Sequence, residues 1–330
     1  MNMKNNKLLV SVLILNWNGD KYIHDCVKSV INQTYKNIEI IIIDNNSTDG
    51  SFEKIRSKYP NLKYIKNNKN LGYAEGMNVG IQASRGDYVM LLGYDVYLPT
   101  NYIEKCINRI EVDNSIGIIA GPEYAWIDGV KTNKHLPSSG AYYLKKRIQV
   151  GIYRNRDLEQ IAFGVTGSFP IIRRALLDDL YNVSGYYFDK AFETGWEDTD
   201  MRFRAMLRGW KTLYYPKVHA WHVGSASDNG NIRLIEKSFD YQKRIFRNRM
   251  YVIEKNLPST IKKWLMPYLC LANILMYIYF FFISRKSLKA IALAKKEFKE
   301  NLDILNVKKK DILDNVLVTD KEIKQYFKKF

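Results

Sequence analysis

Gly86-Asp-Tyr-Val-Met-Leu-Leu-Gly-Tyr-Asp-Val-Tyr-Leu-Pro99 is the stretch that decides the fold. Its apolar run, Tyr88 to Leu92, is short and follows a turn signal, which is typical of a buried parallel strand. Gly93 then loosens the backbone, and Asp95 stands at the carboxyl edge, beyond which open α/β sheets bind their ligands. A carboxylate there can hold a divalent cation, and the cation can hold a diphosphate. Asp is also a typical turn or helix-cap residue, so the flanking sequence has to decide between a ligand-binding and a structural role for Asp95.

Strand and helix patterns alternate on both sides of this stretch. Apolar, β-rich runs at 8–15, 38–43, 62–65 and 116–120 predict four more strands. Apolar residues at helical spacing predict helices between them, within 20–31, 52–55, 70–80 and 103–110. This alternation indicates right-handed crossovers and an α/β fold with a mostly parallel central sheet flanked by helices.

The middle of the chain is less regular. Residues 121–160 are rich in Tyr, Gly and Lys, and they form either a loop with acceptor contacts or an insertion. A strand within 161–169, a helix at 173–180, a helix from 197 to 209 and a strand at 212–215 with a ragged continuation to 222 follow. We place all of this in one domain, residues 1–232.

Composition limits the partners and the compartment. The chain has 330 residues, 46% hydrophobic and 26% charged, as in a globular protein, and a net charge of +17. Much of the excess positive charge lies after Arg233. A basic region of this kind indicates binding to phosphate, nucleic acid or an anionic membrane face, or else it is only a solvated Lys-rich surface. Three distant cysteines offer no disulfide framework or metal spacing, and the N-terminus lacks a signal-peptide layout, so we expect a cytoplasmic location.

Residues 233–330 are predicted to form a C-terminal helical region that is basic and then apolar. The segment 265–283 carries no charge over about 19 residues, which is close to the length that spans a bilayer. Lysines precede it and Arg285, Lys286 and Lys289 follow it, so the flanking charges give no orientation. We favour membrane association, as a span or as an interfacial helix, over a buried helix of a soluble protein.

Two familiar phosphate-binding motifs are missing, because the sequence has neither G-x-G-x-x-G after a strand nor G-x-x-x-x-G-K-[ST]. Metal and side chains must therefore bind any phosphate. Polar residues end strands or begin helices at four places: Asn16 to Asn18, Asp44, Asp95, and Glu197 to Asp200. The first three should meet at one edge of a parallel sheet, which is the expected layout for a nucleotide and its diphosphate.

Three segments carry a resemblance to a known family. They are Ser-Val-Leu-Ile-Leu-Asn-Trp-Asn-Gly from Ser11, Ile-Ile-Ile-Asp-Asn-Asn-Ser-Thr-Asp-Gly-Ser from Ile41, and Asn-Leu-Gly-Tyr-Ala-Glu-Gly-Met-Asn from Asn70. In combination they resemble family-2 glycosyltransferases of the GT-A fold, and more narrowly the rhamnosyltransferase-like branch, over roughly residues 8–225. The resemblance implies inverting transfer of a sugar from a nucleotide donor.

The resemblance also implies roles for single residues. Asp44 matches the position that hydrogen-bonds the donor base, and Asp95 and His222 match the positions that bind Mn²⁺ or Mg²⁺. His219 is the less favoured histidine, with a packed strand end as its alternative role. The substrate-binding set that the resemblance implies is Asn16, Trp17, Asn18, Asp44, Asn46, Gly72, Asn78, Tyr94, Trp196 and Glu197.

Asp198, in the segment Glu197-Asp198-Thr199-Asp200, matches the family's catalytic base. An inverting displacement needs one carboxylate to take the proton from the acceptor hydroxyl, opposite the leaving diphosphate, and this requirement agrees with the assignment. Acids at a helix N-terminus are also favoured by the helix dipole alone, and Asp200 with Arg204 could form a surface pair. We favour the catalytic interpretation of Asp198.

The sequence departs from the family pattern at two places. Gly93-Tyr94 stands where relatives have an Asn or Asp followed by Pro, so one potential metal ligand is lost. Glu75 replaces a usual small residue, and it either lies near the donor and alters the choice of sugar or faces solvent.

We therefore expect a metal-dependent inverting glycosyltransferase on the inner face of the cell membrane. It would move a sugar, with rhamnose the leading donor, onto a lipid-linked surface polysaccharide. The basic segment Lys243 to Arg249 would grip the acceptor pyrophosphate; nucleic acid is the disfavoured partner, because no groove-reading motif is present. The alternatives are a catalytically silent nucleotide-sugar-binding subunit of a membrane glycan complex and, more weakly, a nucleotidyltransferase, which should show a Gly-rich phosphate loop after the first strand.

Overall fold

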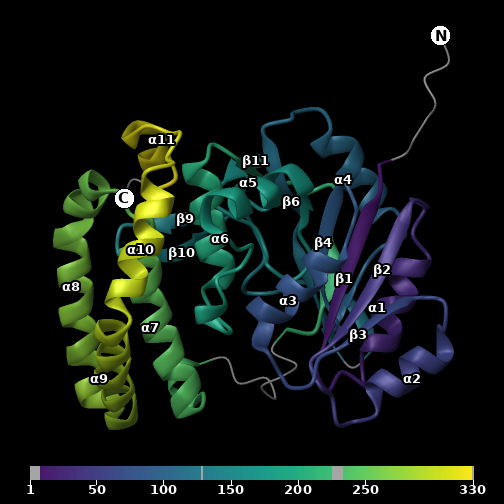
Figure 1. Ribbon diagram of the computed structural model, residues 1–330, viewed down its shortest axis with the longest axis horizontal. Coiled ribbons are helices and arrows are strands. Elements are labelled where there is room, and N and C mark those ends of the chain that lie inside the picture. The colour runs from purple at the N-terminus through teal and green to yellow at the C-terminus, as the bar shows by residue number, and fades with distance from the viewer. Residues whose placement is uncertain (1–7, 128, 225–232, 329–330) are drawn as a thin grey trace.

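The computed structural model describes residues 8–127, 129–224 and 233–328 (Figure 1). A central sheet of eight strands has the order β11-β13-β6-β12-β4-β1-β2-β3. Its strands are β1 Val10–Asn16, β2 Ile38–Asp44, β3 Lys63–Lys66, β4 Tyr88–Gly93, β6 Ile116–Ala120, β11 Gln160–Ala162, β12 Ile171–Arg173 and β13 Lys211–Tyr214.

The sheet is mixed but mostly parallel, because six of its eight strands run in one direction. Strands β4, β1, β2 and β3 pair in parallel, as the alternating pattern predicts, and β13 pairs in parallel with β6. The short strand β12 lies antiparallel between β4 and β6, and β11 is antiparallel to β13. Strands of three residues carry too little periodicity for their direction to be predicted.

The register of the parallel strands brings their polar ends together. Asn16 at the end of β1 is opposite Asp44 at the end of β2, and Leu15 is opposite Gly93 at the end of β4. Strands β1 and β4 are buried almost throughout, since helices pack on the sheet and form one large apolar core with it. These helices are α1 Ile23–Ile31, α2 Ser51–Lys58, α3 Gly72–Ala83, α4 Tyr102–Ile110, α5 Arg174–Ser184 and α6 Glu197–Leu207.

The irregular region 121–160 forms strands as well as loops. A second sheet has the order β5-β14-β7-β8, with β5 Val96–Tyr97, β7 Glu123–Ile127, β8 Val130–His135 and β14 Ala220–His222. A hairpin follows, made of β9 Tyr142–Lys145 and β10 Gln149–Ile152. The second sheet is important for the site because it connects the end of β4 to the segment around His222.

The C-terminal helices form a layer at the side of the molecule away from β1, β2 and β3 (Figure 1). A second apolar cluster, which includes Leu144, Phe203, Val252 and Leu265, joins these helices to α6 and to the β9–β10 hairpin. The predicted domain boundary at 232/233 adjoins residues 225–232, which lie outside the described residues, so the division stays a prediction. The elements are α7 Phe239–Asn256, α8 Ser259–Ile283, α9 Arg285–Glu300, α10 Leu302–Leu313 and α11 Asp320–Gln325, with short 3₁₀ turns at Lys190–Phe192 and Leu234–Glu236.

Within the described part of the chain, α8 is the one helix that is long and apolar enough to cross a membrane by length and composition.

Candidate functional site

A cavity of about 1130 Å³ lies at the carboxyl end of β1 and β4. Its wall is formed by the ends of those strands, the start of α3, the N-terminus of α6, the end of β14 and the first turns of α7. Seven of the predicted site residues line it: Trp17, Gly72, Tyr94, Asp95, Glu197, Asp198 and His222. The C-terminal region contributes Ser238, Tyr241 and Arg244.

Asp95 and His222 face one another in this cavity. The short strand β5 begins directly after Asp95 and pairs with β14, with Val96 opposite His222. This pairing brings the Nε2 atom of His222 within 3.3 Å of the Oδ2 atom of Asp95. Two residues that are far apart in the sequence thus present an imidazole nitrogen and a carboxylate oxygen to the same point.

Glu123, which the sequence analysis did not identify, holds His222 from the other side. Strand β7 pairs with β14, and the Nδ1 atom of His222 lies 3.1 Å from Oε1 of the fully buried Glu123. Glu123 also accepts hydrogen bonds from Thr166 and Ser138, at 2.6 and 2.8 Å. Burial opposes the charge on His222, but the carboxylates of Asp95 and Glu123 outweigh it and raise its pKa to about 10.

The donor set fits a divalent cation whose shell is completed by a diphosphate. Within the residues that the structure describes, no three His, Cys, Asp or Glu side chains gather as a metal site. Asp95 and His222 nevertheless offer one oxygen and one nitrogen to a shared point, and the second nitrogen of His222 meets a carboxylate, as in many metal-binding histidines. Two protein ligands leave positions for phosphate oxygens, which Mg²⁺ and Mn²⁺ prefer together with carboxylates.

The acidic segment enters the cavity from the first turn of α6. The turn before the helix has positive φ at Glu193, Gly195 and Trp196, a tight reversal that only a well-packed surrounding structure tolerates for the two non-glycine residues. The Oδ2 atom of Asp198 lies 2.9 Å from Nη2 of Arg202, one turn along the helix. Asp198 keeps 31% of its side chain exposed, so it is anchored and still open to the cavity.

Glu197 lines the same cavity but is buried. Its Oε2 atom is a buried oxygen that has no hydrogen-bond partner among the described residues. Burial, followed by the neighbouring Asp198 carboxylate, raises the pKa of Glu197 to about 8. The two adjacent acids therefore differ, since Asp198 has a cationic partner whereas the environment of Glu197 favours the protonated form.

Asp200 does not form the surface pair with Arg204 that was one interpretation of the sequence. Both side chains are buried, and the Arg204 Nε atom lies 3.1 Å from Oδ2 of Asp200. The other oxygen of Asp200 lies 3.0 Å from Nζ of Lys255 and accepts a hydrogen bond from Asn256 at 2.8 Å, both at the end of α7. Asp200 thus joins α6 to the C-terminal helices and faces away from the cavity that Asp198 lines.

Asp44 lies beneath the cavity and does not line it. Its carboxylate is fully buried and accepts hydrogen bonds from Asn16 Nδ2 at 2.9 Å and from the Ser47 hydroxyl and amide at 2.6 and 3.0 Å. Asn16 also donates to Ser51, at 2.9 Å. In this arrangement Asp44 fixes the loops after β1 and β2, while the neighbouring Asn45 reaches the cavity wall.

Other predicted substrate-binding residues also lie outside the lining. Asn78 exchanges two hydrogen bonds with the backbone of Phe188, at 2.8 and 2.9 Å, and so holds α3 against the segment that precedes the turn at Lys190–Phe192. Asn18 accepts a hydrogen bond from the amide of Thr48, at 2.8 Å. Asn46 is exposed with positive φ, and Trp196 packs against the second apolar cluster.

Glu75, by contrast, does line the cavity, so the solvent-facing alternative does not describe it.

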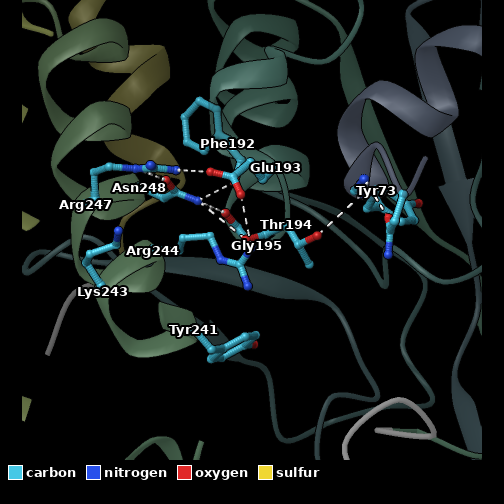
Figure 2. A network of polar contacts seen from close by, with 12 residues as sticks. Tyr73, Phe192, Glu193, Thr194, Gly195, Tyr241, Lys243, Arg244, Arg247 and Asn248 are labelled. Atoms are coloured by element: carbon cyan, nitrogen blue, oxygen red, sulfur yellow. Dashed lines mark hydrogen bonds and ion pairs between the residues drawn. The ribbon is translucent and has the colours of Figure 1, made fainter. Parts of the chain in front are cut away.

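The basic face of α7 is used mostly for internal ion pairs, and Figure 2 shows the pairs that Arg244 and Arg247 form with Glu193. Arg247 contacts Glu193 and Glu297, Lys243 contacts Glu297, and Arg249 donates to backbone carbonyls. Only Arg244 among these cations lines the cavity, where its Nη1 atom lies 3.0 Å from Oε2 of Glu193. The expectation that the whole basic segment grips an anion is therefore corrected to a single arginine, because Arg244 alone among these cations lines the cavity.

Sequence similarity to known proteins extends over much of the region that forms the cavity. The family model "Glycosyl transferase family 2" matches residues 11–181. The chain is 29% identical over 239 residues to the UDP-Glc:alpha-D-GlcNAc-diphosphoundecaprenol beta-1,3-glucosyltransferase WfaP of Escherichia coli, a match that covers 70% of this chain and 84% of that protein. It is 25% identical over 188 residues to the Glycosyltransferase GlyG of Streptococcus pneumoniae, covering 55% of this chain and 62% of that protein.

Other relatives match over shorter segments. An uncharacterized glycosyltransferase of Haemophilus influenzae is 35% identical over 111 residues, which is 33% of this chain and 34% of that protein. The match thus spans about a third of that relative's length.

Solved structures share the fold. The crystal structure of GalNAc-T7 with UDP, GalNAc and Mn²⁺ superposes with a TM-score of 0.60 at 19% identity, over 76% of this chain and 49% of that chain. The structure of S. aureus TarS 1-349 in complex with UDP gives a TM-score of 0.54 at 16% identity, over 96% and 92%. These likenesses confirm the predicted GT-A-like α/β architecture.

Proposed function

The chain belongs to glycosyl transferase family 2, and from this premise we propose that it is a metal-dependent inverting glycosyltransferase that uses a nucleotide-diphosphate sugar. The observation that carries the proposal is one cavity in which Asp95, His222 and Asp198 all take part. Asp95 and His222 mark the place for the diphosphate, and Asp198 marks the place for the acceptor hydroxyl.

The side chains can perform a single displacement. The acceptor oxygen bonds to the anomeric carbon, the bond from that carbon to the diphosphate oxygen breaks, and the hydroxyl proton passes to Asp198. Arg202, whose Nη2 atom lies 2.9 Å from Oδ2 of Asp198, keeps that carboxylate oriented before the proton arrives. A cation held by Asp95 and His222 would neutralise the charge that develops on the leaving diphosphate.

Asp44 and its hydrogen-bond network support the donor pocket from below in this scheme. The base of the nucleotide would lie against Trp17 and Asn45, which line the cavity, and Asp44 would reach it only through a shift of the loop that it anchors. Gly72, Tyr94 and Glu197 would complete the wall around the donor.

For the donor sugar we propose a hexose, with rhamnose and glucose as the two candidates. The resemblance to the rhamnosyltransferase-like branch favours rhamnose, whereas WfaP is named for UDP-glucose. For the acceptor we propose a glycan linked to a lipid by diphosphate at the cytoplasmic face of the membrane. The name of WfaP supports this acceptor, and Arg244 offers one cavity-lining cation for its phosphate.

Incubation of the purified chain with Mn²⁺ and a panel of nucleotide sugars, followed by assay of nucleoside diphosphate release, tests the proposal. We expect Asp198→Asn to lower turnover by about 10²–10⁴-fold because the base is lost. Asp178→Asn, an exposed aspartate on α5, is the matched control and should leave turnover unchanged. No turnover of any donor, or an Asp198→Asn variant that behaves like wild type, would contradict the assignment.

A second candidate is a catalytically silent nucleotide-sugar-binding subunit. It is favoured by one observation, namely that no three-residue metal cluster is present in the described residues. This candidate expects donor binding by calorimetry that is the same with Mn²⁺ and with a chelator, and no diphosphate release. Metal-dependent release would eliminate it.

A further inference from the structure

Helix α8 leaves a long apolar surface uncovered. No charged residue occurs between Lys263 and Arg285. Large apolar side chains along its outer face are exposed, including Leu271 at 57% and Phe282 at 76%. Only 11% of its most apolar window is buried. A helix that is apolar on all sides belongs in a protein core or in a membrane, and the other residues that the structure describes do not cover it.

The inner face of α8 is anchored at both ends to the same body. Near its start, Ile261 and Leu265 are buried in the second apolar cluster, and the ring of Trp264 lies 5.4 Å from that of Phe327. Near its end, Phe280 packs on Phe246 of α7, with ring centroids 5.5 Å apart. The helix therefore lies along the side of the protein and cannot leave it without loss of both contacts, as its position in Figure 1 also shows.

The helices beside α8 are too polar to accompany it into a bilayer core. Ser284 alone separates α8 from α9, and α9 packs against both α7 and α8. Lys243 and Arg247 of α7 form ion pairs with Glu297 of α9. If α8 crossed the hydrocarbon region, these charges would enter it as well, at a cost of several kcal/mol each.

Positive charge at both ends of the exposed apolar face indicates which kind of surface this face binds. Lys263 precedes the apolar stretch, Arg285 and Lys289 follow it, and all three are exposed. Aromatic residues, from Tyr277 to Phe282, are concentrated at its end. Cations and aromatic rings around an apolar strip are the features by which helices bind the interface of anionic membranes.

We propose that α8 lies in the plane of an anionic lipid membrane, with the face that carries Leu271, Leu275, Ile278 and Phe282 inserted among the acyl chains. It binds as an interfacial helix about 37 Å long and does not span the bilayer. The proposal rests on the contacts of α8 alone, so its test is independent of the sugar-transfer chemistry.

Flotation of the full chain with lipid vesicles tests the binding. We expect it to float with vesicles of phosphatidylcholine that contain about 30% phosphatidylglycerol, more weakly with phosphatidylcholine alone, and less as salt rises. Leu275→Glu with Phe282→Glu should lower partition by at least about tenfold, because two inserted side chains are lost. The matched control, Val112→Glu with Leu158→Glu, changes two exposed apolar residues outside α8 and should leave partition unchanged.

Depth measurements then separate an in-plane helix from a spanning one. Leu271 and Phe282 are three helical turns apart and lie on one face, and Cys26 and Cys106 are buried, so Cys270→Ser provides a background for Leu271→Cys and Phe282→Cys labelled with a fluorophore. Quenchers at set depths should reach both labels equally. A spanning helix would separate the two labels in depth by about 16 Å.

Three results would overturn the proposal. The first is a wild-type chain that stays with the aqueous phase at every lipid composition. The second is a depth difference between the two labels. The third is a vesicle-independent dimer, seen by sedimentation, that the Leu275→Glu/Phe282→Glu pair converts to monomer, since a second copy would then cover the face. Circular dichroism and thermal unfolding of each variant confirm that it is folded.

Discussion

Glu197 and Asp198 are neighbours in the chain, but at the residue scale their environments differ. Asp198 pairs with Arg202 and keeps a third of its side chain open, which suits a base that must be ionised before reaction. Glu197 is buried beside Asp198, with an oxygen that has no partner within the described part of the chain. Buried acids with a raised pKa, such as Glu197, are frequent in catalytic sites.

We predict that Glu197→Gln stabilises the protein in alkaline solution. The pKa of Glu197 is raised to about 8, so the folded state holds this proton more tightly than the unfolded chain does. Its contribution to stability is complete below the ordinary pKa of about 4.5 and is lost as pH rises toward 8. The neutral amide avoids that loss and should gain on the order of 2 kcal/mol at pH 9 over wild type.

Urea unfolding between pH 5 and pH 9 measures this effect. Wild type should lose stability over that range more steeply than the Glu197→Gln variant. Glu300→Gln, which removes an exposed acid on α9, is the control and should follow wild type. Parallel curves for wild type and Glu197→Gln would show that Glu197 is ionised in the folded protein.

At the element scale, short strand pairings determine the site more than the long helices do. The pairing of β5 with β14 places Asp95 beside His222, and the pairing of β7 with β14 places Glu123 behind it. Each pairing involves only two or three residue pairs, yet together they fix a histidine between two carboxylates.

Glu123→Gln should weaken Mn²⁺ binding by about 10–100-fold, as losses of such supporting carboxylates do. The amide cannot hold the imidazole of His222 with the same strength, so its Nε2 atom is less firmly directed toward Asp95. Titration of Mn²⁺ in the presence of UDP, followed by electron paramagnetic resonance, reports the affinity without any turnover. Glu39→Gln, which changes a carboxylate near the opposite edge of the sheet, is the control, and equal affinities for wild type and Glu123→Gln would refute the positioning role.

The junction of α6 and α7 depends on one buried lysine. Lys255 lies 2.6 Å from Asp189 and 3.0 Å from Asp200, and all three side chains are buried. Burial alone would raise the pKa of Asp189, but Lys255 and Lys308 outweigh it and hold that pKa below its usual value. The stability from this pairing is therefore present above the ordinary pKa of Asp and is lost as pH falls below it.

Lys255→Met should lower the unfolding free energy at pH 7 by about 3–5 kcal/mol, because two acids are left without their shared cation. Denaturant unfolding measures the change. Lys296→Met removes an exposed lysine from a 3.9 Å pair and should cost less than about 1 kcal/mol. A Lys255→Met variant as stable as this control would mean that the buried network does not hold α7 to α6.

The strand ends show how far the sequence could predict the site. Asn16, Asp44 and Asp95 were expected at one edge of the sheet, and the register confirms this because apolar runs and their polar ends are local signals. The cavity wall was harder to predict, since the side chain of Asp44 points into a buried hydrogen-bond network and Asn45 lines the cavity in its place. Glu123 carries no local signal at all, because only the pairing of distant strands brings it to His222.

At the scale of the whole molecule, the C-terminal helices both line the cavity and support the segments around it. Arg244 and Tyr241 line the cavity, and Asn248 donates to the backbone of Phe192 and Gly195, just before α6 (Figure 2). The basic composition of α7 could not show which cations are free for a ligand, because that depends on acids such as Glu193 and Glu297 from other segments. The same helical layer presents the exposed face of α8, so one region supports the cavity and carries the apolar surface for which we propose membrane binding.

A crystal structure with UDP and Mn²⁺ would test the proposed arrangement of the site. We predict Mn²⁺ in contact with Asp95 and His222, the diphosphate on that ion, and the Asp198 carboxylate facing the open side of the cavity where the sugar and its acceptor meet. Nucleotide bound elsewhere on the chain, or Mn²⁺ held by other residues with Asp198 turned away from the ligand, would contradict it.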